Sequence, residues 1–160
     1  MQQPADSPKK VAGLHEVGRV VSHRYTFTEE NIRAYAAMAG DTNPLHHDGE
    51  LAASSRFGSL IASAAHTTGV LISVVADKFA ANGEAVGLGF DLTLRRAVKA
   101  GTETDLIWAI AEKKWSEKLN GTVVTLTGEI RDVANSLTLL NATGSLLLLT
   151  HKSASPDDAG

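Results

Sequence analysis

Residues 60–81, LIASAAHTTGVLISVVADKFAA, give the strongest indication of the fold. Apolar and small side chains fill almost every position of this segment. The pattern predicts one long helix that is buried on most of its sides. Ser63, His66 and Asp77 make the stretch too polar to span a bilayer. A buried helix needs other elements around it, so we expect the rest of the chain to supply a sheet that covers it.

The chain after the long helix has the period of β-strands. From about Val86 onward, apolar residues recur at every second position, as they do at Leu106, Trp108 and Ile110. The Asn-Gly pair at 120–121 separates two such runs and predicts a tight hairpin. We therefore expect four strands in this part of the chain, joined by hairpin-type links.

The chain before the long helix predicts one strand followed by shorter helices. Residues 17–27 are rich in side chains that favour strands. Thr28 is expected to cap a helix that has acids in its first turn and ends at Gly40, and Asp48 is expected to cap a shorter one. One strand, two or three helices and four further strands predict an α+β fold with a largely antiparallel sheet.

Composition and charge narrow the class of protein. The 160 residues suit one domain, which we place at 13–150 between flexible polar tails at 1–12 and 151–160. A net charge of −3 argues against a nucleic-acid partner. The chain has no cysteine, which excludes disulfides, thiol catalysis and Cys-ligated metal sites. Its N-terminus lacks the pattern of a secretory signal, so we expect a soluble cytoplasmic protein without a membrane partner.

Side chains capable of acid–base chemistry gather in residues 40–48, GDTNPLHHD. Pro44 bends and stiffens the chain between Asp41 and His46, so a carboxylate and an imidazole can converge there. The alternative is an Asx-type turn in which Asp41 and Asn43 bond the local backbone and His46 lies at the surface. Spacing alone leaves both interpretations open.

His66 has two interpretations of its own. It is either a buried core or interface residue or a pocket residue that contacts substrate. The positive end of the helix dipole disfavours a protonated imidazole, so we expect His66 to be neutral at pH 7. A metal site formed by His46, His47, Asp48 and His66 is a weaker hypothesis, because adjacent side chains tend to point apart and no His-Glu-x-x-His pattern occurs.

The stretch at 35–48, YAAMAGDTNPLHHD, resembles the hydratase 2 signature of the MaoC-like, (R)-specific enoyl-CoA hydratase family. FGSLI at 57–61 and LRRAVKAG at 94–101 resemble further segments of that family, so the resemblance covers about 18–150. It implies a hot-dog fold, in which a curved antiparallel sheet wraps around one long central helix. It also implies a homodimer joined at the sheet edges or a higher oligomer, and no metal or redox cofactor.

The activity implied by the resemblance is reversible syn addition of water to a trans-2-enoyl thioester. Asp41 and His46 would hold one water, with Asp41 as the base, while Asn43 and Pro44 would fix the loop. Ser63 and Ala64 stand where the family usually has His-Gly, and with His66 they form the expected oxyanion and substrate pocket. A neutral His66 would suit an acyl group that carries an oxygen or a branch near the thioester.

The sequence leaves alternatives open for both the acyl carrier and the type of reaction. Arg95, Arg96 and Lys99 are candidates for contacts with the phosphates of CoA, and a solvated turn is the other interpretation. The carrier is either CoA or a carrier protein. A hot-dog acyl-CoA thioesterase that uses Asp41, or a catalytically silent acyl-CoA-binding protein, is the alternative function, since a fold does not specify an activity.

Overall fold

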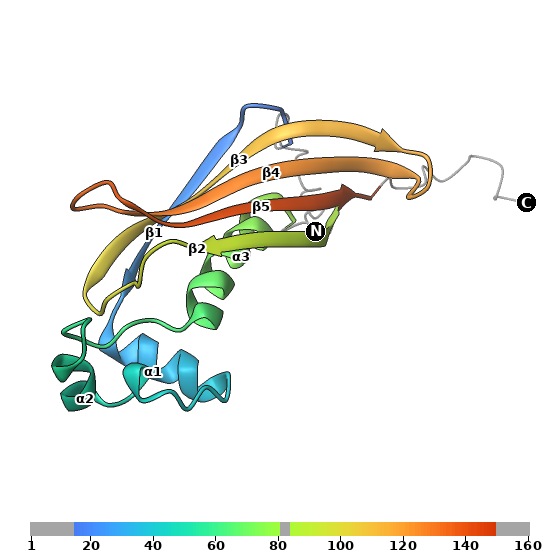
Figure 1. The fold of residues 1–160 in the computed structure, drawn as a ribbon. Coiled ribbons are helices and arrows are strands. Elements are labelled where there is room, and N and C mark those ends of the chain that lie inside the picture. The colour runs from blue at the N-terminus through green and yellow to red at the C-terminus, as the bar shows by residue number, and fades with distance from the viewer. Residues whose placement is uncertain (1–14, 81–83, 150–160) are drawn as a thin grey trace, which may run out of the picture.

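The computed structural model describes residues 15–80 and 84–149, so the tails predicted at 1–12 and 151–160 lie outside the described residues (Figure 1). The elements follow the predicted order of one strand, helices and four strands. In chain order they are β1 (Val20–Phe27), α1 (Glu29–Met38), the 3-10 turn η1 (Pro44–His46), α2 (Gly49–Ser54), α3 (Ala64–Phe79), β2 (Ala85–Leu94), β3 (Thr102–Ser116), β4 (Gly121–Asp132) and β5 (Thr138–Leu148).

The five strands form one antiparallel sheet in the order β1-β3-β4-β5-β2. The sheet arches over α3, while α1 and α2 lie together at the end where α3 begins (Figure 1). The Asn-Gly hairpin joins β3 to β4, with Asn120 at a positive φ of 47°. This architecture confirms the α+β prediction and the hot-dog fold.

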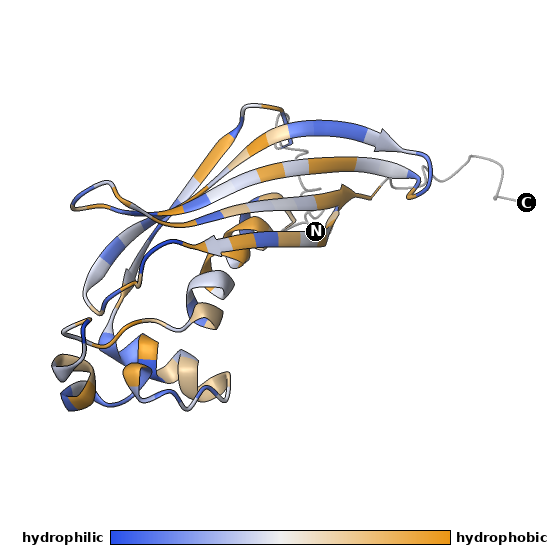
Figure 2. Cartoon of the chain, in the orientation of Figure 1, coloured by the Kyte–Doolittle hydropathy of each residue, from blue (hydrophilic) through white to orange (hydrophobic). Residues whose placement is uncertain are grey.

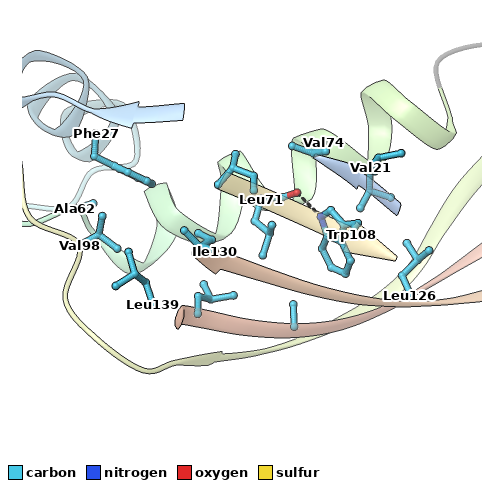
Figure 3. Packing of buried hydrophobic residues seen from close by; sticks show 14 of the residues in the cluster. Val21, Phe27, Ala62, Leu71, Val74, Val98, Trp108, Leu126, Ile130 and Leu139 are labelled. Carbon is cyan, nitrogen blue, oxygen red and sulfur yellow. Dashed lines mark hydrogen bonds between the residues drawn. The ribbon is translucent and has the colours of Figure 1, made fainter. Parts of the chain in front are cut away.

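Trp108 anchors the sheet to α3. It is fully buried, and its indole N–H donates to the Leu71 carbonyl of α3 at 2.8 Å (Figure 3). Trp108 is paired in register with Gly128 on β4, where an added Cβ would overlap the indole. The ring therefore lies against the sheet only because β4 has a glycine there. Buried positions alternate with more exposed ones along β3 through this contact, and Figure 2 shows hydrophobic bands in both β3 and β4.

The central helix begins at Ala64 rather than at Leu60, which corrects the sequence-based boundary. The segment before it is extended because it pairs with the chain after β2. The Ala62 N–H donates to the Val98 carbonyl at 2.8 Å, and the Ala100 N–H donates to the Leu60 carbonyl at 2.8 Å. These partners lie far along the chain, so local composition gave no sign of them.

The burial of α3 is also narrower than predicted. The sheet covers one side of the helix, and the other side is exposed in the single chain because no described element packs over it. The buried positions are His66, Thr67, Leu71, Val74, Val75 and Phe79. The exposed positions are Ala64, Ala65, Ser73, Ala76, Asp77 and Lys78.

The capping predictions at the start of the chain are confirmed. Thr28 Oγ1 accepts the Asn31 N–H at 3.1 Å, and Gly40 adopts a φ of 72° just after α1. Asp48 caps α2 by accepting two backbone N–H groups. β1 begins later than predicted, because Gly18 forms a turn with a φ of 86°. No helix within the described ranges has the length and apolar character needed to cross a membrane.

Candidate active site

The loop between α1 and α2 is shaped by its own side chains. Asp41 Oδ1 accepts the Asn43 N–H at 3.0 Å, and Asn43 Oδ1 accepts the Leu45 N–H at 3.1 Å. Pro44 then opens the 3-10 turn that ends at His46. The local bonding is therefore that of the Asx-type turn. It uses only one oxygen of Asp41 and leaves Oδ2 to face elsewhere.

His46 is buried rather than exposed, with only 6% of its surface accessible. Its Nδ1 lies 2.7 Å from the Ile61 carbonyl oxygen, which can only accept, so Nδ1 carries a proton. In the neutral ring, Nε2 then has a free lone pair. This Nε2 lies 3.5 Å from Asp41 Oδ2, whose side chain is 35% exposed. Both atoms can accept a hydrogen bond, so a donor such as a water that reaches both can bond to the two of them.

The start of α3 lies close to this pair, because Ile61 is only three residues before the helix begins at Ala64. Ser63 is the N-cap, and its Oγ accepts the His66 N–H at 3.1 Å. Ala64 and Ala65 are exposed and are the first residues of a 16-residue helix, so their N–H groups have no acceptor within it. The positive end of the helix dipole adds to their attraction for a negative charge. The structure thus brings Asp41, His46 and the helix start into one region.

His66 does not line an open pocket, contrary to the predicted site. Its side chain is fully buried, with Nε2 2.9 Å from Tyr25 Oη and the ring stacked on Tyr35 at 4.5 Å. Burial lowers the pKa of His66 to about 4, so the ring is neutral as predicted, although desolvation rather than the helix dipole is the cause. The expected preference for an oxygen-bearing acyl group loses its support, because the enclosed ring is already held by its neighbours.

Residues 12–130 match the family model of the MaoC like domain, which is most of the chain. The protein belongs to the MaoC-like domain family. Comparison with curated protein sequences found no match. The match includes the Asp41 loop, α3, β2, β3 and β4 as far as Ile130.

Solved structures share the fold of this MaoC-like chain. R-hydratase PhaJ1 from Pseudomonas aeruginosa is 21% identical with a TM-score of 0.74, covering 84% of this chain and 82% of that one. The (R)-hydratase from A. caviae involved in PHA biosynthesis is 22% identical with a TM-score of 0.72, covering 83% and 96%. The HadBC (3R-hydroxyacyl-ACP dehydratase) complex from Mycobacterium tuberculosis is 17% identical with a TM-score of 0.67, covering 82% and 96%. At these identities, the likeness establishes the hot-dog fold.

Three basic residues of the MaoC-like chain lie in the loop after β2. Arg95, Arg96 and Lys99 are all exposed. The Arg96 guanidinium donates to the Thr138 carbonyl at 2.8 Å, which holds one of the three in place. The backbone of Lys99 forms an isolated antiparallel β-bridge with Ile61, the residue whose carbonyl accepts a hydrogen bond from His46. The loop therefore adjoins the candidate site, and its charges face solvent.

Two further residues hold the loop and were missed by sequence analysis. His47 Nε2 donates to the Asp41 carbonyl at 2.6 Å, and Arg33 Nε donates to the His47 carbonyl at 3.0 Å. The sequence offered His47 only as a weak metal ligand, and Arg33 stands on α1 with no local signal. No group of three or more His, Asp or Glu side chains in the described part of the chain is placed to hold a metal ion.

Proposed function

We propose that this protein is a hydro-lyase that adds water reversibly, with syn geometry, to a trans-2-enoyl thioester. The observation that carries the proposal is the Asp41–His46 pair, with Oδ2 and Nε2 3.5 Å apart and Nδ1 of His46 tied to Ile61. Membership of the MaoC-like family and the shared fold with hydratases support it.

In the proposed reaction, a single water donates one hydrogen bond to Asp41 Oδ2 and a second hydrogen bond to His46 Nε2. Asp41 takes a proton from the water while the water oxygen forms a bond to C3 of the enoyl thioester. The C2–C3 double bond becomes an enolate, whose negative charge lies on the thioester oxygen. The proton held by the pair then passes to C2, with His46 assisting, so that one water is added in total. Dehydration is the reverse sequence.

The start of α3 supplies the stabilisation of the enolate. The N–H groups of Ala64 and Ala65 are unpaired within the helix and stand at the positive end of its dipole. Such fixed donors lower the barrier because they are already oriented when the charge develops. Ala64 keeps the backbone N–H of the family's glycine and adds a methyl group, which narrows the space for substrate beside this N–H. The acid–base steps require no metal or redox cofactor.

The exposed cations of the loop after β2 are proposed to contact the phosphates of the acyl carrier. These cations are Arg95, Arg96 and Lys99. Among the described residues, the Arg96 side chain alone of the three has a hydrogen-bond partner, the Thr138 carbonyl. Both CoA and the phosphopantetheine of a carrier protein have a pantetheine arm with the thioester at one end and a phosphate at the other. We further propose a role in cytoplasmic acyl-thioester metabolism, in keeping with a chain that has no cysteine.

We also propose that two copies of the chain pair through β2. This strand is one edge of the sheet, and its Val86, Leu88 and Leu94 are 44%, 44% and 52% exposed. An exposed apolar edge strand tends to pair with another chain. A second copy presents the same edge, so antiparallel pairing about a two-fold axis covers both edges at once.

Incubation with crotonyl-CoA tests the proposed function. Hydration removes the absorbance of the enoyl thioester without releasing free thiol, and we expect this result. Release of free thiol would identify a thioesterase. Binding of acyl-CoA with neither change would identify a catalytically silent protein, provided that longer and branched enoyl-CoA substrates gave the same outcome.

A further inference from the structure

The buried imidazole of His66 joins three elements at one point. A hydrogen bond of 2.9 Å links its Nε2 to Tyr25 Oη on β1, and the ring is stacked on Tyr35 of α1 at 4.5 Å, with an angle of 9° between the planes. Phe27 of β1 packs at 4.9 Å on the same ring and points toward α3 (Figure 3). The proposed reaction does not use any of these side chains.

The chain keeps this arrangement despite two unfavourable features. His66 Nδ1 is buried and has no hydrogen-bond partner among residues 15–80 and 84–149, a cost that an apolar side chain would avoid. Gly69, in the interior of α3, is unfavourable for helix stability, yet an added Cβ there would collide with Tyr35 Oη. Gly69 leaves the space that Tyr35 occupies when its ring stacks on His66.

Short hydrogen-bonded links connect the stacked pair to the two halves of the candidate site. On α1, the carbonyl of Ala36, the residue after Tyr35, accepts the Asp41 N–H at 2.9 Å. On α3, the His66 N–H is bound by Ser63 Oγ at the cap, directly before Ala64. A shift of Tyr35 against His66 would therefore move Asp41 relative to the start of α3.

We propose that the contact among Tyr25, His66 and Tyr35 positions the start of α3 against the Asp41 loop, and so sets the separation between the acid–base pair and the helix N–H groups. This inference rests on the proposed function. His66 and the two tyrosines are positioning residues, because none of them touches the reacting atoms. A misplacement of about 1 Å in such a site costs about 100-fold in rate.

The double variant Tyr25→Phe/His66→Leu tests the inference. It removes both partners of the hydrogen bond and the unpartnered nitrogen together, so the folded state should keep its melting temperature or gain. We expect kcat for enoyl-CoA hydration to fall about 10- to 100-fold with KM changed less than about threefold. The pH profile should keep its shape, because His66 transfers no proton.

Tyr25→Phe alone is a second, milder variant, for which we expect a loss of about tenfold in kcat. It keeps the inference falsifiable if the double variant does not fold. His23→Leu is the matched control, since it makes the same chemical change at an exposed position of β1 and should leave kcat unchanged. A folded double variant with kcat within twofold of the natural protein would overturn the inference.

The failure of the inference is distinguishable from failure of the proposed function. If the natural protein hydrates enoyl-CoA but neither variant lowers kcat, only the positioning role fails. If the natural protein hydrates no enoyl thioester, the proposed function fails and the inference with it. A changed pH profile in the double variant would assign His66 to proton transfer and overturn the positioning role.

Discussion

Replacing Asp41 with Asn isolates the basicity of this side chain from its role in shaping the loop. The amide oxygen of Asn can still accept the Asn43 N–H, a bond of 3.0 Å in the natural protein. The amide nitrogen takes the place of Oδ2, 3.5 Å from His46 Nε2, and a nitrogen that donates cannot remove a proton from water. The substitution therefore preserves the turn and removes the proposed base.

The expected magnitude follows from these contacts. Loss of a positioned general base lowers the rate by about 10²–10⁴-fold, which corresponds to about 3–5 kcal/mol of barrier. The free energy of unfolding should change by less than about 1 kcal/mol, because the side chain is 35% exposed and its turn bond is retained. Enoyl-thioester absorbance gives the rate, and urea unfolding gives the stability.

Asp48→Asn is the matched control. Asp48 lies in the same loop, and its Oδ1 accepts the N–H groups of Glu50 and Leu51 at 3.0 Å each. Asn caps a helix about as well as Asp does, so this variant loses the same charge without loss of activity or fold. Asp41 is not the base if Asp41→Asn keeps more than about half of the natural kcat, or if Asp48→Asn loses as much activity as Asp41→Asn.

Three further predictions concern the partner base, the pH dependence and the assembly. His46→Ala should lower kcat about as much as Asp41→Asn, and the double variant should be little worse than the worse single one, because the pair acts as a unit; steady-state kinetics on the three variants checks this. The pKa of the buried His66 is lowered from 6.5 to about 4, so the unfolded chain binds a proton between these pH values that the native protein does not. The free energy of unfolding should therefore fall by up to about 3 kcal/mol as the pH drops from about 6.5 to about 4, and denaturant titrations should show this slope disappear in His66→Leu. Light scattering at micromolar concentration should give twice the chain mass of 16.8 kDa, and a charged substitution such as Leu88→Lys on β2 should shift it to the single-chain value; a single-chain mass for the natural protein would contradict pairing through β2.

Most of the fold was predictable because its signals are local. Thr28 and Asp48 cap helices through side-chain bonds that span two or three residues, and the Asn-Gly pair at 120–121 bends the chain where the alternation is interrupted. Strand periodicity in the second half reports burial on one face of a sheet. These features fix the order of elements and, with it, the α+β class.

The candidate site was predictable in its composition but not in its geometry. Asp41, Asn43 and Pro44 lie within four residues, so their turn follows from the sequence. The burial of His46 does not, since its Nδ1 is held by Ile61, 15 residues away. Spacing alone left both a surface histidine and a catalytic one open, and the tertiary contact shows that His46 is buried.

By itself, the sequence determined the helix caps, the turn at Asn43 and the alternation of the strands, because each depends on bonds or burial within a few residues. The start of α3 at Ala64 depends on tertiary contacts, since the pairing of Leu60 with Ala100 requires the two segments to meet in space. The burial of His66 depends on tertiary contacts as well. The ring is enclosed by side chains from β1 and α1, and the stack with Tyr35 forms only when α1 packs on α3 beside Gly69.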